Sequence, residues 1–227
     1  MKSTYAKSTL IHHPWSYRVP FLYEQAFQWY PSFDNLGELI DRPNPTSALE
    51  LLSKVFDHLV KDCSWPPNRI HLFGFAQGGS VAVEFGVKWW KLQLQTPTSA
   101  TMNSEINVGN AKEDINSLPP PPESSLGSIV TISGPLLSYP TLAPSALSPT
   151  PLLVVHRPPP AEPALPPGSL TAFKKAYKTV REVKLEAKGP GMPSSKEEWG
   201  PIMHFWSERI GKRQVEGLYE VMSGLAS

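Results

Sequence analysis

A short apolar segment that leads through a glycine-bounded turn into a helix constrains the fold of this chain more than any other feature. Residues 69–73 (RIHLF) have the apolar character of a buried strand, and residues 79–93 carry apolar side chains at helical spacing. The residues around the turn are Gly74, Phe75, Ala76, Gln77, Gly78 and Gly79. Strand and helix backbones pass closely in so tight a turn, which glycine permits because it has no Cβ. The sequence therefore predicts a strand–turn–helix unit with Ala76 at its tip.

Strands and helices are expected to alternate along the rest of the chain. Apolar, β-branched runs predict strands at 128–133 and 152–156, and the alternation over 183–186 is typical of a half-exposed edge strand. Helical spacing of apolar residues predicts helices at 46–62, 169–180 and 197–210. This order predicts an α/β fold with a mostly parallel sheet between two layers of helices, a three-layer αβα sandwich.

Two of these helices carry more detailed expectations. Ser47 and Glu50 have the spacing of a capping box at the start of the first helix. In the last helix, His204 lies opposite the apolar stripe and is expected to point away from the core. The residues of that stripe are Trp199, Ile202, Met203, Trp206 and Ile210.

Composition sets the remaining limits. The 227 residues suffice for one α/β domain spanning 1–227, and residues 94–127, rich in Ser, Thr and Asn with prolines at 119–122, predict a disordered or mobile insertion. The formal net charge of +1 argues against a nucleic-acid-binding surface. The single cysteine, Cys63, excludes an internal disulfide and a thiolate zinc cluster. Because there is no apolar run long enough to span a membrane and no signal-peptide core at the N-terminus, we expect a soluble cytoplasmic protein. We also expect neither a bound metal nor a cofactor.

The turn itself has the form of a nucleophile elbow without its nucleophile. A Gly-x-Ser-x-Gly turn between a strand and a helix holds a serine where it can attack a substrate, and here Ala76 occupies the central position. The segment RIHLFGFAQGG resembles the elbow of the acyl-protein thioesterase and carboxylesterase family of α/β-hydrolases, whose usual form is GFSQGG. Residues 29–34, 67–70, 152–156 and 191–192 are similar to further segments of that family. The resemblance extends over about residues 9–211, apart from the insertion.

The resemblance implies an α/β-hydrolase-like fold, with a serine nucleophile, a histidine base, an acid and an oxyanion hole serving ester or thioester hydrolysis. On this chain it places Glu162 near the acid position, shifted by two residues, although a solvated loop carboxylate is the equal alternative. It places Pro193 at or beside the histidine position. Of the oxyanion hole, the Gln77 N–H remains, and Trp29, Tyr30 and Phe75 are expected to line the cleft.

Other candidates for the missing groups are weaker. Ser80, one turn into the helix, is not expected to reach the nucleophile position, and His204 is expected at the surface. His156 ends a strand where the family keeps a histidine that is not the base, while His58 and His71 have the character of structural residues. His12 and His13 lie near a strand end expected at 9–12.

The N-terminal part departs from the family. In the family, an N-terminal strand ends in a His-Gly loop that donates a second oxyanion N–H, and residues 1–9 show neither the strand nor the loop. The resemblance therefore implies that N-terminal strands are missing or truncated. Either residues 10–12 pair with 70–73, or the sequence is a shortened version of a longer protein.

Three functions remain open. The first is a pseudo-hydrolase that binds an acyl or ester ligand, or a protein partner, without turnover. The second is an active carboxylesterase or acyl-protein thioesterase represented here by a Ser-to-Ala or truncated form. The third is an interaction scaffold that uses the insertion at 94–127 and the proline runs at 119–122 and 158–160. The sequence predicts neither the ligand nor the oligomeric state.

Overall fold

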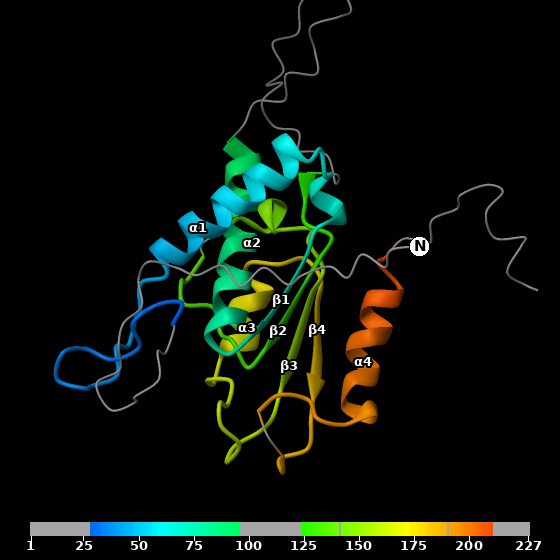
Figure 1. Cartoon of the computed structure of the whole chain (residues 1–227). Coiled ribbons are helices and arrows are strands. Elements are labelled where there is room, and N and C mark those ends of the chain that lie inside the picture. Colours follow the sequence, from blue (N-terminus) through cyan, green and yellow to red (C-terminus); the bar gives the residue numbers. More distant parts are fainter. Residues whose placement is uncertain (1–27, 96–123, 141, 190, 211–227) are drawn as a thin grey trace, which may run out of the picture.

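The computed structural model describes residues 28–95, 124–140, 142–189 and 191–210 (Figure 1). Within these ranges, one parallel sheet has the strand order β1-β2-β3-β4. Its strands are β1 (His71–Phe75), β2 (Ser128–Ile132), β3 (Leu152–His156) and β4 (Val180–Lys184). The expected strand at 9–12 and its pairing with 70–73 lie outside the described residues.

The α-helices are α1 (Thr46–Asp57), α2 (Gln77–Gln95), α3 (Ser169–Lys174) and α4 (Lys196–Ser207), and α1 continues directly into a π-helical turn, His58–Asp62. Two of the α-helices lie between strands in the chain, α2 between β1 and β2 and α3 between β3 and β4, while α1 precedes β1 and α4 follows β4. Short 3₁₀ turns cover Pro67–Arg69 and Pro144–Ala146. Among the described residues, no helix has the length and apolar character that a membrane span requires.

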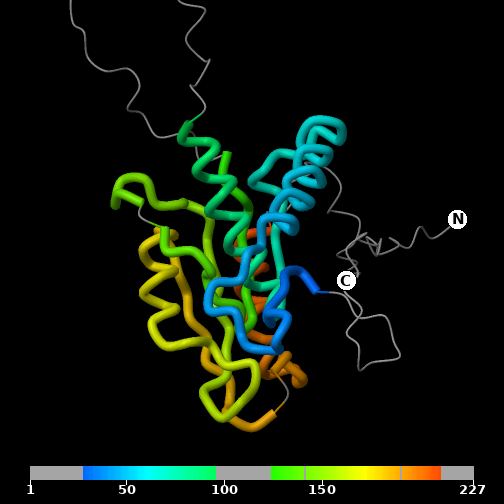
Figure 2. The backbone as a smooth tube through the Cα atoms, turned by 90° about the vertical axis from the view of Figure 1, so that its left-hand side faces the viewer, coloured from blue at the N-terminus to red at the C-terminus, as the bar shows by residue number. Residues whose placement is uncertain are grey.

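The sheet is covered on both faces. In Figure 1, α1, α2 and α3 lie on one side of the strands and α4 lies on the other. Figure 2, viewed from the side of the first three helices, shows α4 behind the sheet. Alternate residues of β2 and β3 point to opposite faces of the sheet and belong to two separate cores. Ile129, Leu152 and Val154 pack with the first group of helices. Val130, Leu153 and Val155 pack with α4. The predicted three-layer αβα architecture is therefore confirmed.

Several element ends differ from the sequence predictions. β4 begins at Val180 because it pairs in register along the whole of β3, from Leu152 to His156. α3 ends at Lys174, and the chain then turns, which buries Ala176 and Tyr177 in the core. The expected insertion at 94–127 is narrower at both ends, since α2 extends to Gln95 and Leu126 is buried; residues 96–123 lie outside the described part.

The prediction of a capping box at the start of the first helix is wrong. α1 begins at Thr46, so Ser47 already lies inside the first turn, and no side chain caps the helix at Pro45. The Asn44 side chain instead accepts a hydrogen bond from the Thr46 N–H at 3.0 Å.

The buried face of α4 also differs from the expected stripe. Ile202 and Phe205 are buried, whereas Met203 and Ile210 are each 58% exposed. The helix thus presents to the sheet a face rotated toward Phe205, which the sequence stripe had omitted. His204 lies on the solvent side, as predicted, with its side chain 73% exposed.

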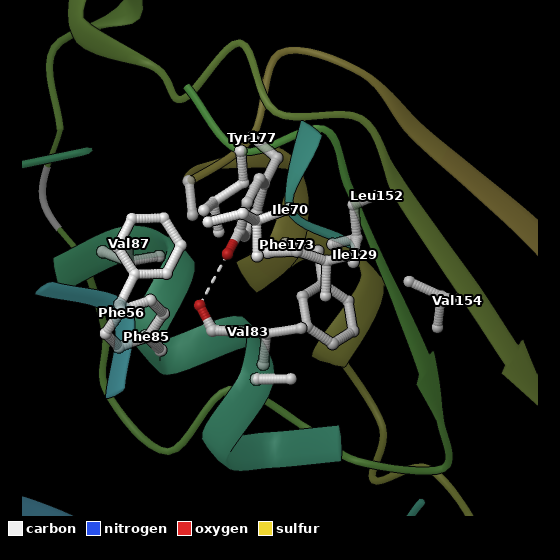
Figure 3. Packing of buried hydrophobic residues seen from close by; sticks show 13 residues of the cluster. Phe56, Ile70, Val83, Phe85, Val87, Ile129, Leu152, Val154, Phe173 and Tyr177 are labelled. Atoms are coloured by element: carbon white, nitrogen blue, oxygen red, sulfur yellow. Dashed lines mark hydrogen bonds between the residues drawn. The ribbon is translucent and has the colours of Figure 1, made fainter. Parts of the chain in front are cut away.

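Tyr177 joins the end of α3 to the middle of α2. Its hydroxyl donates a hydrogen bond to the Val83 carbonyl oxygen at 2.5 Å (Figure 3). Burial raises the pKa of Tyr177 well above its ordinary value. The ring reaches this position because residue 86 is glycine: a Cβ there would lie 2.5 Å from the Tyr177 hydroxyl oxygen and would overlap Ile129 Cδ1.

This close approach yields a matched pair of glycine substitutions. Gly86→Ala is expected to destabilise the fold by about 1–3 kcal/mol, because the buried neighbours must move to admit a methyl group. Gly200→Ala, in α4 with no atom within 4 Å of the added Cβ, is expected to stabilise it by up to about 1 kcal/mol through helix propensity. Urea unfolding of both variants measures the difference, and equal effects would contradict the packing described here.

Candidate functional site

The turn between β1 and α2 has the geometry of an elbow. Ala76 has a φ of +48°, in the left-handed region that residues with a side chain rarely adopt. Its N–H donates to the Ile132 carbonyl oxygen at 2.8 Å, and its own carbonyl accepts from the Ser80 N–H at 3.0 Å. The turn is thus fastened to the end of β2 on one side and to the first turn of α2 on the other.

Gly74 is essential to this geometry. A Cβ on Gly74 would overlap the backbone carbonyl of Gly78, so strand and helix pass as closely as the sequence predicts. Gly79 is similarly confined, since a Cβ there would lie 2.5 Å from Thr131 Oγ1 on β2. The Gly78 position is more open: its nearest neighbour would be the indole Nε1 of Trp29, at 3.3 Å.

Gln77 holds the preceding segment of the chain against the elbow. Its side-chain oxygen accepts a hydrogen bond from the Trp29 N–H at 3.0 Å. Its amide nitrogen donates to the Tyr30 carbonyl oxygen at 3.2 Å and to Ser32 Oγ at 2.7 Å. A single side chain therefore fixes the Trp29 region beside the elbow. The sequence predicts only a backbone role for Gln77, so this use of its side chain is an addition from the structure.

The three aromatic residues expected in the cleft divide into two groups. Trp29 is 45% exposed and lies against Gly78, and Phe75 is partly buried beside α4. Tyr30 is only 7% exposed and packs with Ala48 and Val81 in the core. Burial raises the pKa of Tyr30. Trp29 and Phe75, but not Tyr30, therefore offer apolar surface beside the elbow.

Two loops and the end of β1, all of which resemble site segments of the hydrolase family, meet at this end of the sheet. A Cβ built on Gly191 would lie 2.8 Å from Pro163 Cδ, 3.0 Å from Phe75 Cζ and 3.1 Å from the Glu162 carbonyl oxygen. The loop after β3, the loop before α4 and the elbow strand thus meet around Gly191. The Glu162 side chain is exposed, in keeping with the solvated alternative, and Pro193 is buried.

The loop that carries Pro193 is fixed to α4. The Trp199 indole N–H donates to the Pro193 carbonyl oxygen at 3.1 Å. Ser195 caps the helix by accepting from the Glu198 N–H at 3.3 Å, and the Ser194 N–H donates to Glu198 Oε2 at 2.8 Å. These contacts leave Pro193 as a structural element of the loop.

A buried ion pair reinforces the same loop. The Arg157 guanidinium, 1% exposed, lies 2.6 Å from Glu198 Oε1 and donates to the Glu186 carbonyl oxygen at 2.7 Å. The Ser194 N–H lowers the pKa of Glu198, and Arg157 lowers it further. The Ser195-x-x-Glu198 spacing at the helix start is a readable capping signal, but no sequence pattern indicates that Glu198 also pairs with Arg157.

A buried carboxylate lies in α2. Glu84 accepts hydrogen bonds from the N–H groups of Leu137 and Ser138, each at 2.7 Å, and from Ser138 Oγ at 2.8 Å. It thereby holds the loop that follows β2 against the helix. No sequence pattern indicated it, because Glu84 falls among apolar helix positions.

The alternative catalytic groups are either buried or paired with other side chains. The Ser80 side chain is fully buried. His71 contacts Ser128 Oγ at 2.8 Å, and burial lowers its pKa. His156 contacts Glu182 at 2.8 Å and His204 contacts Glu208 at 3.2 Å, and neither contact involves the elbow. His12 and His13 lie outside the described residues.

Two further features bear on ligands. In the part of the chain that the structure describes, no group of three or more His, Cys, Asp or Glu side chains is arranged to hold a metal ion. A hollow of about 680 Å³ lies between the loop after β2 and α3, bordered among others by Tyr139, Leu142, Ala172 and Lys175. None of the expected cleft residues lines it.

One relative by sequence and several solved structures are similar to this chain. No family model matches the chain. An uncharacterized hydrolase of Mycosarcoma maydis is 30% identical over 204 residues, which cover 88% of this chain. The chain spans 65% of the length of that relative.

Solved structures share the architecture at low sequence identity. Acyl-protein thioesterase 2 of Zea mays superposes with a TM-score of 0.52 at 18% identity, over 81% of this chain and 73% of that one. SOBER1 of Arabidopsis thaliana gives a TM-score of 0.50 at 15% identity, over 81% and 74% of the two chains. The chain therefore has an α/β-hydrolase fold.

The Arg157–Glu198 pair predicts a pH-dependent contribution to stability. Glu198→Gln is expected to destabilise the fold by roughly 2 kcal/mol at pH 7, because the buried guanidinium loses its charged partner. The pKa of Glu198 is lower in the folded chain than the ordinary glutamate value near 4.3. The difference between wild type and variant is therefore full above about pH 5 and decreases as the pH falls through the lowered pKa.

Denaturant unfolding from pH 7 to pH 3 measures this difference. Glu186→Gln is the matched control, since the Glu186 side chain is exposed and only its backbone carbonyl contacts Arg157. A Glu198→Gln effect that is independent of pH would contradict the assignment.

Proposed function

We propose that this chain is a non-catalytic member of the serine carboxylic-ester and thioester hydrolases, which keeps the elbow but lacks its nucleophile. The observation that supports the proposal best is Ala76, whose φ of +48° retains the strained elbow conformation around a methyl group. Non-glycine residues in this region cost about 1–3 kcal/mol each and persist where the surrounding structure holds them. Here the elbow keeps this strain without a reactive side chain.

The chemistry of acyl transfer explains why such a site would be inactive. A serine hydrolase forms a covalent acyl intermediate on a hydroxyl oxygen whose proton passes to a base. The Ala76 methyl group has no lone pair, so no such intermediate forms. Proline cannot accept a proton through its side chain, and the Pro193 carbonyl already accepts the Trp199 indole N–H. Both the nucleophile and the base of the implied mechanism are replaced.

Binding without turnover is the activity that this geometry supports. Trp29, which lies against Gly78, and Phe75, which precedes Ala76, supply apolar surface near the elbow, and Gln77 holds the Trp29 segment in place. An acyl chain has the complementary apolar chemistry. We therefore propose an acyl or ester ligand for this site, with an acylated protein as the larger form of the same ligand.

An active serine hydrolase is the second candidate. The M. maydis relative bears the name hydrolase, and the chain matches 65% of its length. In this alternative, Ala76 replaces a serine that the active form carries, and the catalytic base comes from a position outside the family pattern.

A series of substitutions at the elbow distinguishes the two candidates. The wild-type chain is expected to show no hydrolysis of a short p-nitrophenyl ester and no labelling by a fluorophosphonate, because it has no nucleophilic oxygen at the elbow. Ala76→Ser alone is expected to restore little activity, since no residue in the described ranges is seen to offer a base to the new hydroxyl. Steady-state rates and probe labelling are measured for wild type, Ala76→Ser, Pro193→His and the double variant.

Each outcome decides between the readings. Wild-type turnover that survives repeated purification would refute the non-catalytic proposal. High activity of Ala76→Ser alone would support the second candidate and point to an unrecognised base. Activity only in the double variant would support loss of both groups from a retained scaffold.

Binding is tested with a fluorescent dodecanoyl ester, which the wild-type chain is expected to bind without cleaving. Trp29→Ala is expected to weaken binding about tenfold, the loss of roughly 1.4 kcal/mol of apolar contact. Trp65→Ala is the matched control, because Trp65 is similarly exposed, at 53%, and lies in the turn after α1. Equal weakening by both substitutions, or no saturable binding, would contradict an acyl site at the elbow.

A further inference from the structure

A cysteine, a histidine and an aspartate lie together on the surface at the end of the first helix. His58 Nδ1 is 2.6 Å from Asp62 Oδ2, and Cys63 Sγ is 3.8 Å from His58 Nε2. Cys63 is exposed, and the side chains of His58 and Asp62 are 64% and 67% exposed. A thiol, an imidazole and a carboxylate in this order form a nucleophile, a base and a group that orients the base.

The π-helical turn brings these residues together. In an α-helix, residues five apart in sequence lie roughly 140° apart around the axis. In the turn His58–Asp62, the Cys63 N–H instead donates to the His58 carbonyl oxygen at 3.1 Å. Residue 63 therefore lies one turn beyond residue 58 on the same side of the helix. Single π-helical turns of this kind are frequent at functional sites.

Asp62 pairs with the His58 imidazole, while the neighbouring Lys61 pairs with a different carboxylate. Lys61 pairs with Asp57 at 3.2 Å, one residue back from the cluster. With the Asp62 carboxylate accepting the Nδ1 hydrogen, Nε2 carries the lone pair that faces Cys63.

We propose that Cys63 is a site of reversible mixed-disulfide formation, activated by His58 and Asp62. The proton of Cys63 Sγ passes to His58 Nε2, and the thiolate attacks one sulfur of a low-molecular-weight disulfide. The disulfide S–S bond breaks as the new S–S bond forms, and the departing thiolate takes a proton from the imidazolium. The incoming disulfide is the oxidant, so electrons balance, and a second thiol reverses the step. This inference is independent of the proposed function at the elbow.

The chain is well suited to a direct test because Cys63 is its only cysteine. Wild type is incubated at pH 7 with bis(2-hydroxyethyl) disulfide, an uncharged probe, and the mass increase is followed over time. The native chain is expected to react about tenfold faster than the same chain unfolded in urea. His58→Gln is expected to lower the native rate about tenfold, and Asp62→Asn to lower it by less.

Two controls separate activation by the imidazole from other effects. His204→Gln removes an exposed helical histidine with the same four-residue spacing to a carboxylate but without a thiol, and it should leave the rate unchanged. The double variant His58→Gln/Asp62→Asn removes the carboxylate charge together with the imidazole, and it should remain slow.

The proposal has clear ways to fail. A native rate equal to that of the unfolded chain would overturn it. So would a wild-type rate in His58→Gln, or recovery of the wild-type rate in the double variant, which would assign the effect to the Asp62 charge. Circular dichroism of each variant confirms that the helix is retained.

Discussion

The rest of this structure depends on one constraint, the close contact between the backbones of Gly74 and Gly78. Any side chain at Gly74 would overlap the Gly78 carbonyl, so β1 and α2 can meet at this angle only with glycine there. The approach places the first turn of α2 against β2, where Gly79 and Gly134 leave room for it. The positive φ of Ala76 follows, because the chain must reverse direction within the turn.

Much of the fold could be predicted because burial on both faces leaves a local mark. All five residues of β2 are buried, and the bounds of β3 match the expected run, since a strand covered by helices on both sides is rich in apolar and β-branched residues. Helix ends and faces were predicted less well. The cap of α1 depends on where the first turn begins, and the buried face of α4 depends on how it lies across the sheet, and neither is local.

The candidate site shows the same division. The elbow was predictable because the close approach of strand and helix requires glycines at positions only a few residues apart in the sequence. The convergence of the loops around Gly191 followed from the resemblance, and the structure brings them together. The Arg157–Glu198 pair and the buried Glu84 were not predictable, because charged residues buried by partners far away in sequence have no periodicity that reveals them. Both of them hold loops at the end of the sheet where the elbow lies.

The lengths of the connections between the strands also affect how the sheet assembles. The connections from β2 to β3 and from β3 to β4 are similar in length, whereas the segment between β1 and β2 is more than twice as long as either. The entropy cost of closing a flexible loop rises by about 0.6 kcal/mol for each doubling of its length. Chain entropy therefore favours pairing of β2, β3 and β4 before β1 is added together with its neighbour α2. In that order, the turn at Ala76 would take up its positive φ after β2, whose Ile132 carbonyl accepts the Ala76 N–H, is in place.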